Sequence, residues 1–233
     1  MEDQFARTNT LLGPEAMLAL AAARVAVFGL GGVGGICAEA LARTGVGSID
    51  LFDHDRVSIT NLNRQVIALH STLGQYKADV MAARLKDINP GLQVRAVKLF
   101  YMPDTSGDVD LTRYDYVIDA IDTVAGKVEL IAQSKKTGTA IICAMGAANK
   151  TDPLALAVTD IHKTDTDPLA KAVRKELRAL GIEGIKAAWS KEEPKIRCRP
   201  PASDAVVPQA LGLLLASEVI KDLIKKSAET PAI

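Results

Sequence analysis

A glycine-rich turn near the start of the chain constrains its fold more than any other feature. The turn, Gly29-Leu30-Gly31-Gly32-Val33-Gly34, follows the apolar run Val25-Ala26-Val27-Phe28 and precedes a helical pattern that ends near Arg43. Glycines between a strand and a helix let backbone N–H groups approach a phosphate, whose charge the helix N-terminus favours. The sequence therefore predicts a strand, a phosphate-binding turn and a helix, which together begin a mononucleotide-binding unit.

The next predicted strand, residues 48–53, supplies a second element of a nucleotide site. It ends in Asp53, where a carboxylate can accept hydrogen bonds from ribose hydroxyls. Gly29, Gly31 and Gly34 have the spacing G-x-G-x-x-G that is typical of such sites. This pattern predicts a nucleotide but does not identify it, since NAD, FAD and ATP all fit a turn of this kind.

Beyond this unit, apolar β-rich runs continue to alternate with helical patterns. The expected strands are residues 92–99, 114–119, 139–144 and 155–159, and the expected helices are 14–23, 77–88, 127–136, 168–180 and 208–226. Such alternation predicts an α/β fold: a Rossmann-like, doubly wound, mostly parallel sheet with flanking helices. Residues 184–189 are expected to form an edge strand, and the charged, proline-containing residues 190–204 a loop. With 233 residues and no repeat or linker, the chain is expected to be a single domain over residues 1–233.

Composition excludes several classes of protein. Lys plus Arg and Asp plus Glu number 28 each, so an RNA partner would have to meet a local basic patch. The three cysteines, Cys37, Cys143 and Cys198, form no CxxC pair, which argues against a disulfide framework and a four-cysteine zinc site. The polar N-terminus is no signal peptide, and the apolar residues 210–224 are too few to span a bilayer. We therefore expect a cytoplasmic protein with no membrane partner.

The segment after the second predicted strand carries a more specific signal. Asp53-His54-Asp55-Arg56-Val57-Ser58-Ile59-Thr60-Asn61-Leu62-Asn63-Arg64-Gln65 resembles the D-x-D-x-V…x-N-L-x-R-Q signature of the ThiF/MoeB/HesA (E1-like) superfamily. Lys77, the strand-end segment Asp119-Ala120-Ile121-Asp122, and Arg7 ahead of the first helix resemble further parts of that pattern. The resemblance implies an E1-like adenylation domain, which uses ATP to activate a carboxylate.

The resemblance also implies a role for each matching residue. Arg64, Lys77 and an Arg7 lent by a neighbouring subunit would stabilise negative charge on the α-phosphate and on leaving pyrophosphate. Asp122 would hold Mg²⁺ and Asn61 would orient phosphates, whereas Asp119 is either a ligand or an orienting group. Because Arg7 would act across a subunit boundary, a homodimer is implied. The residues that would hold the nucleotide are Gly29, Gly31, Gly32, Gly34, Asp53, Asp55, Asn61, Arg64, Lys77 and Asp122.

Three segments resemble one branch of the superfamily, the tRNA threonylcarbamoyladenosine dehydratases. They are residues 4–13, residues 158–178, which include Asp167-Pro168-Leu169-Ala170, and Pro201-Ala202-Ser203. The branch implies ATP-dependent dehydration of N6-threonylcarbamoyladenosine in tRNA to its cyclic form, through adenylation of the threonine carboxylate. Ring closure within one bound nucleoside is intramolecular, so positioning can supply much of the acceleration. A cysteine desulfurase or sulfur-acceptor system is a further partner to consider.

Two other enzyme functions compete with this interpretation, as does a non-enzymatic scaffold. An adenylyltransferase that activates the C-terminus of a ubiquitin-like sulfur-carrier protein would usually carry two CxxC zinc pairs, and this chain has none. A NAD-dependent oxidoreductase would leave Arg7, Arg64 and Asp122 without roles. A scaffold derived from the fold would have lost those same residues.

Basic residues after residue 170 are candidates for an RNA-binding patch, and the alternative is that they form a solvated helix face. Trp189, among them, either stacks on a base or packs at a dimer interface. Some dehydratases carry a cysteine directly before the late Ala-Ser, where this chain has Pro201; Cys198 lies three residues earlier, and we expect it to be dispensable. Cys37 and Cys143 are expected in the core. The basic residues are Lys171, Arg174, Lys175, Arg178, Lys186, Lys191, Lys195, Arg197 and Arg199.

Overall fold

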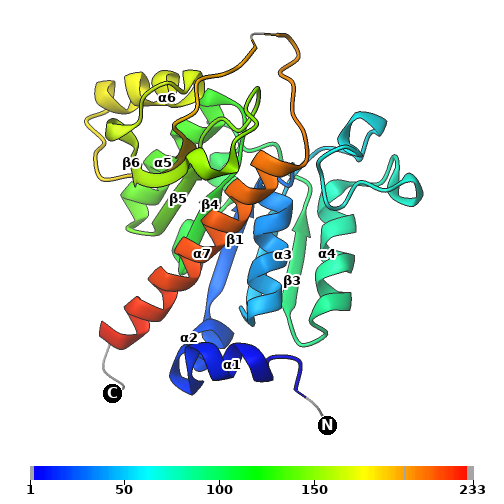
Figure 1. Ribbon diagram of the computed structural model, residues 1–233. Helices are drawn as coiled ribbons and strands as arrows, with labels where there is room; N and C mark the ends of the chain where they lie inside the picture. Colours follow the sequence, from blue (N-terminus) through cyan, green and yellow to red (C-terminus); the bar gives the residue numbers. More distant parts are fainter. Residues whose placement is uncertain (1–2, 197, 230–233) are drawn as a thin grey trace.

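The computed structural model describes residues 3–196 and 198–229, and its centre is one sheet of seven strands (Figure 1). The strand order is β3-β2-β1-β4-β5-β7-β6, and every neighbouring pair is parallel except β6 and β7. This arrangement confirms the prediction of a mostly parallel α/β sheet. The strands are β1 (Arg24–Phe28), β2 (Ser48–Phe52), β3 (Gln93–Val97), β4 (Tyr116–Asp119), β5 (Ala140–Ala144), β6 (Leu156–Asp160) and β7 (Lys186–Ser190).

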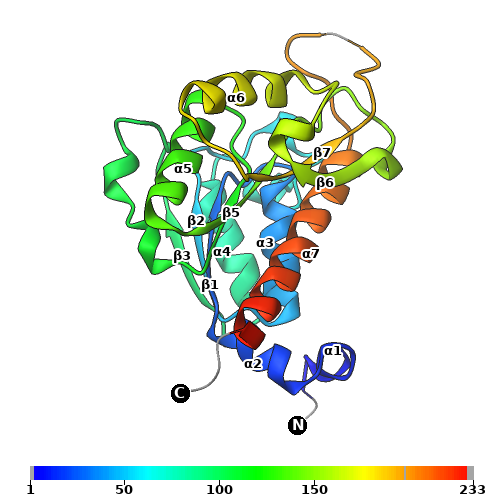
Figure 2. The ribbon, with the colours of Figure 1, turned by 90° about the vertical axis from the view of Figure 1, so that its left-hand side faces the viewer.

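Helices cover both faces of this sheet (Figure 2). Helices α3, α4 and α7 share one core cluster with side chains such as Val25 and Val27, and α5 and α6 share another with Ala26 and Phe28. Neighbouring residues of one strand thus face opposite cores, so a central strand reads as a continuous apolar run. The helices are α1 (Ala6–Leu12), α2 (Pro14–Ala22), α3 (Gly34–Thr44), α4 (Lys77–Ile88), α5 (Val124–Thr137), α6 (Pro168–Ala179) and α7 (Val206–Glu229).

The prediction of an edge strand at residues 184–189 is wrong as to its position in the sheet. Strand β7 occupies residues 186–190 but lies inside the sheet, between β5 and β6, and β6 forms the edge. Ala187 and Ala188 are buried and small, which lets layers of helices approach β7 from both sides, whereas β6 is only half-buried along its length. The position of a strand within the sheet depends on this packing, which local sequence does not report.

Helix α7 is the longest helix described, and it packs along α3. Gly212 makes that contact close, because a Cβ there would lie 2.3 Å from the carbonyl oxygen of Val33. The helix carries Glu218, Lys221 and Asp222 within its apolar sequence. In the part of the chain that the structure describes, no helix is both long and apolar enough to cross a membrane.

Candidate active site

A cavity of about 1390 Å³ opens at the carboxyl ends of the parallel strands. Its lining includes residues at or just after the ends of β1, β2, β4 and β5. Strands β1 and β4 are neighbours in the sheet although β2 and β3 intervene in the chain, so connections leave this point in opposite directions. Ligands of open α/β sheets bind at such a topological switch point.

The glycine turn forms the floor of this cavity. Gly29 has φ of 87°, and a Cβ on it would lie 2.5 Å from the carbonyl oxygen of Ala120, which follows β4. A Cβ on Gly34 would lie 1.8 Å from the carbonyl oxygen of Gly29. Gly29, Gly31 and Gly32 line the cavity, whereas Gly34 shapes the turn from behind. Both close approaches require glycine, and they keep the backbone accessible to a phosphate.

Asp53 fastens this turn to the end of β2. Its Oδ2 accepts a hydrogen bond of 2.7 Å from Leu30 N–H, and its Oδ1 accepts one of 2.8 Å from Asp55 N–H. The side chain is buried yet lines the cavity. A carboxylate has about four acceptor positions, so two remain for a ligand hydroxyl.

The long segment between β2 and α4 brings four predicted residues to the same cavity. Lys77 is buried, and its Nζ lies 2.7 Å from Oδ2 of the half-exposed Asp55. Asn61 is also buried, and its Oδ1 accepts a 3.0 Å hydrogen bond from Ser58 N–H. Arg64 donates from Nη1 to the carbonyl oxygen of Thr60 at 2.9 Å, which leaves the rest of its guanidinium for a ligand. All four predicted side chains line the cavity.

The two acidic residues after β4 have different surroundings. Asp122 is exposed and lines the cavity, so its carboxylate is accessible to a metal ion. Asp119 is 0% exposed, and its Oδ2 lies 2.8 Å from Nζ of Lys127, which is also 0% exposed. Burial raises the pKa of the Asp119 carboxyl above its ordinary value, and the Lys127 ammonium opposes that shift. Asp119 therefore lies beneath the site, paired with Lys127, and it does not line the cavity.

Arg7 does not line this cavity. It is an exposed residue of α1, which lies below the amino ends of the strands, at the opposite end of the molecule from α6 (Figures 1 and 2). Within the chain, Arg7 therefore lies away from the other predicted site residues.

The structure adds a second wall that the motifs did not indicate. It includes residues 144–150, the start of α6, and parts of the loop 194–203. Lys150 Nζ is buried there, 3.1 Å from Oδ2 of Asp167 and 2.9 Å from the carbonyl oxygen of Gly146. Asp167 also caps α6, accepting from Ala170 N–H at 2.8 Å. The pattern Asp-Pro predicted the cap, but Lys150 carried no signal in the sequence.

Asn149, in the segment after β5, holds the loop 194–203 by hydrogen bonds. Its φ of 62° is left-handed, a conformation that asparagine tolerates. Its N–H donates to the carbonyl oxygen of Ala202 at 2.7 Å, and its Oδ1 accepts from Ala202 N–H at 2.8 Å. Its carbonyl oxygen accepts from Lys195 N–H at 2.9 Å. The loop is thus held from both sides of its bend.

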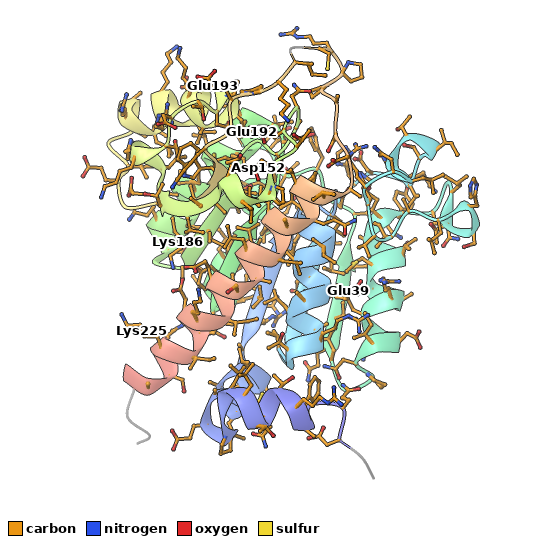
Figure 3. The ribbon with its side chains drawn as sticks, in the orientation of Figure 1. Glu39, Asp152, Lys186, Glu192, Glu193 and Lys225 are labelled. Carbon is orange, nitrogen blue, oxygen red and sulfur yellow. The ribbon has the colours of Figure 1, made fainter. Side chains whose placement is uncertain are left out.

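The flanks of this loop are held as well. Glu192 accepts from the N–H groups of Thr151 and Asp152 at 2.9 and 2.8 Å (Figure 3). The N–H of Asp152 above all holds the pKa of Glu192 below its ordinary value. Asn63, next to the predicted arginine of the site, donates from Nδ2 to the carbonyl oxygen of Ser203 at 2.8 Å.

Two predictions for the basic segment are wrong. Trp189 is 4% exposed and belongs to the core cluster under α5 and α6, so it neither stacks on a base nor packs at a dimer interface. Lys186 points to the other face of the sheet, where its Nζ lies 2.7 Å from Asp222 of α7 (Figure 3). Successive residues of a strand face opposite sides, so Lys186 and Trp189, three positions apart, lie on opposite faces of β7. Lys186 does not line the cavity.

Other basic residues of that segment do reach the cavity. Lys171, Arg174 and Arg199 line it, whereas Arg197 lies outside the described residues. Cys198 is exposed and lines the cavity, with its Sγ 3.4 Å from Oδ1 of Asn149.

The other two cysteines confirm their prediction. Cys37 and Cys143 are fully buried, and burial raises the pKa of both thiols above its ordinary value. They are small core residues, as expected.

The fold and the cavity define an α/β protein of the ThiF type, and the ThiF family model matches residues 5–232. The chain is 46% identical to the tRNA threonylcarbamoyladenosine dehydratase of Bacillus subtilis, over 97% of this chain and 96% of that protein. It is 40% identical to the Escherichia coli enzyme of that name, over 98% of this chain and 81% of that protein. The E. coli enzyme in complex with ATP superposes with a TM-score of 0.90 at 37% identity, covering 98% of this chain and 96% of that one. The chain therefore belongs to the ThiF family and, within it, to the tRNA threonylcarbamoyladenosine dehydratases.

Proposed function

We propose that this chain catalyses the ATP-dependent dehydration of N6-threonylcarbamoyladenosine in tRNA to its cyclic form. One observation carries the proposal: a single cavity collects the glycine turn, Asp53, Arg64, Lys77 and Asp122. These are the residue types that adenylation of a carboxylate needs, namely a phosphate cradle, a ribose acceptor, fixed cations and a metal ligand. The relatives named for this reaction support the choice of substrate.

The reaction divides into two displacements that share one site. In the first, a threonine carboxylate oxygen attacks the α-phosphorus of ATP and pyrophosphate leaves, which gives a mixed anhydride with AMP. In the second, an atom of the carbamoyl group attacks the activated carbonyl carbon, AMP leaves and a proton is released. The oxygen lost from the carboxylate departs on AMP, so the nucleoside loses one water. Because the second step is intramolecular, positioning can supply much of its acceleration.

The cations of the cavity act in the first displacement. Lys77 is already fixed by Asp55, so little reorganisation is needed when charge develops on the phosphoryl oxygens. Arg64 is held on its own segment by Thr60 and has donors to spare. Arg7 would join them only from the second subunit of a homodimer, because α1 lies at the opposite end of its own molecule from α6, whose start lines the cavity.

The donor set near β4 fits Mg²⁺. Asp122 offers an exposed carboxylate in the cavity, and hard oxygen ligands are the ones that Mg²⁺ prefers. When bound, the ion would neutralise charge on the phosphates. Asp53, His54 and Asp55 form another group of neighbouring donors, but Asp55 is already paired with Lys77. Asp122 is therefore the proposed ligand.

Four other predictions accompany this proposal. They are a single ThiF-type domain over residues 1–233, a homodimer, a cytoplasmic location, and a cysteine desulfurase or sulfur-acceptor system as a partner.

The test is a reconstitution with purified protein, ATP, Mg²⁺ and tRNA that carries N6-threonylcarbamoyladenosine. Digestion to nucleosides and mass spectrometry should show ATP-dependent loss of one water from that nucleoside. A Lys77→Met variant that keeps its fold should lose the reaction, since removing one preorganised donor to a developing oxyanion costs about 10²–10³ in kcat. An unchanged nucleoside, with ATP binding verified separately, would overturn the proposal and favour a carrier-protein carboxylate.

A further inference from the structure

The cavity is lined by basic side chains in addition to Arg64 and Lys77, which the proposed adenylation uses. Lys77 has the Asp55 carboxylate beside it, and Lys150 has that of Asp167. Lys171 and Arg174 line the same cavity from α6, and among the described residues neither has a carboxylate partner. Cations that face a cavity without a counter-charge are suited to an anionic ligand.

The packing of α6 against the core explains why these two side chains face the cavity. Ala170, Val173 and Leu177 are fully buried and fix one stripe of the helix against the core. Lys171 and Arg174, one turn apart, lie beside that stripe and are exposed and half-exposed, respectively.

The start of this helix is fixed as well. The cap Asp167 is buried and held by Lys150, which also contacts the carbonyl oxygens of Gly146 and Ser190. Arg174 is further held by a hydrogen bond from Nη1 to Oγ1 of Thr164. The two cations therefore stand on a rigid support, which reduces the entropy lost on binding.

Resting on the proposed function, we propose that Lys171 and Arg174 bind the RNA phosphates that flank the modified nucleotide. The glycine turn, Asp53 and Lys77 line the cavity opposite the start of α6, so a carboxylate that enters on the side of α6 faces the proposed nucleotide site. A nucleotide that is splayed out of an RNA strand brings its neighbouring phosphates to the mouth of the pocket that receives it. Two cations on a fixed helix face give those phosphates charge-assisted contacts without reading a base.

The experiment compares Lys171→Ala/Arg174→Ala with the control Lys86→Ala/Lys136→Ala. The control removes the same charge from exposed positions in the last turns of α4 and α5, which lie at the amino ends of the strands. Binding of tRNA carrying the modification is measured over a range of salt concentrations, together with ATP binding and kcat at saturating tRNA. Lys171→Glu alone is the second variant, because it leaves the contact between Arg174 and Thr164 intact.

We expect the α6 double variant to raise the Kd for tRNA on the order of tenfold to a hundredfold. The slope of log K against log salt should fall by about 1.4, because about 0.7 is lost for each single-strand phosphate contact. ATP affinity and kcat at saturating tRNA should stay at the level of the control pair. Lys171→Glu should shift the tRNA Kd in the same direction.

Three outcomes separate this inference from the proposed function. If tRNA affinity and salt slope match those of the control pair, the inference is overturned even though the enzyme cyclises its substrate. If the wild-type chain binds tRNA through these residues but forms no cyclic nucleoside, the inference stands and the proposed function fails. If the two cations instead govern binding of a carrier-protein tail, with no effect on tRNA, an RNA site on α6 is excluded.

Discussion

Replacing Lys127 with methionine should destabilise the buried layer beneath the cavity, where this side chain contacts Asp119 and Ala144. Lys127 and Asp119 are both 0% exposed, and Lys127 Nζ also donates to the carbonyl oxygen of Ala144 at 2.9 Å. The ammonium thus joins the carboxyl ends of β4 and β5 under the site. Without it, Asp119 keeps a hydrogen bond of 3.1 Å from Ile121 N–H and one from the Cys143 thiol, neither of which carries a positive charge. The Ala144 carbonyl loses its side-chain partner.

The size of the effect follows from the loss of a partner to a buried charge. Removing one member of a buried ion pair costs about 3–5 kcal/mol. In a domain of this size each kcal/mol lowers Tm by about 2–4 °C, so Lys127→Met should melt roughly 6–20 °C below the wild type. The double variant Asp119→Asn/Lys127→Met removes both charges and should recover much of that loss.

The pH dependence provides a second check on the same variant. Burial already raises the pKa of Asp119 above its unfolded value, and loss of Lys127, which opposes that shift, should raise it further. A group with a raised folded pKa binds its proton more tightly in the folded state, so the variant gains stability relative to the wild type as pH falls. The difference in Tm should therefore narrow in acid and widen above neutral pH.

Thermal melts followed by circular dichroism over pH 5–8 test these expectations. A Lys127→Met variant that melts within about 2 °C of the wild type at neutral pH would refute the reasoning, because that change is below 1 kcal/mol. A double variant no more stable than the single one would show that the uncompensated Asp119 charge is not the cause.

Further predictions concern other parts of the chain. Gly34→Ala should abolish ATP binding measured by calorimetry, because its Cβ would lie 1.8 Å from the Gly29 carbonyl oxygen, whereas Gly107→Ala, with open space around it, should bind ATP normally. Although burial alone would raise the pKa of Asp50, hydrogen bonds from a tyrosine and two arginines lower it, so its contribution to stability is present above its unfolded pKa and is lost as pH falls through the folded one. Asp50→Asn should therefore lower Tm at neutral pH and flatten its decline in acid; an unchanged acid limb would contradict this. Cys198→Ser should keep most cyclisation activity, since the exposed thiol has only a weak contact, and a folded but inactive variant would disprove it.

Part of the site was predictable because the residues that form it are contiguous in the sequence. A phosphate-binding turn needs glycines at fixed spacing between one strand and one helix, and Gly29 and Gly34 show why in their close backbone contacts. Asp53 and Lys77 stand at the ends of elements whose patterns were recognisable, so their placement at one edge of a parallel sheet followed from the fold class. The resemblance to one family then supplied roles that spacing alone could not.

The second wall depended on contacts between distant segments. Lys150 meets Asp167 only because the segment after β5 turns back beside the start of α6. Trp189 and Lys186 belong to one short strand in a basic segment, and only the position of β7 inside the sheet sent one into the core and the other toward α7.

The sequence by itself determined the fold class, the nucleotide turn and the family. The tertiary structure alone decided which basic side chains face the cavity and which form ion pairs with acidic side chains elsewhere. The physical reason is that periodicity specifies the buried face of an element, whereas the neighbour that covers this face is chosen by packing of the whole chain.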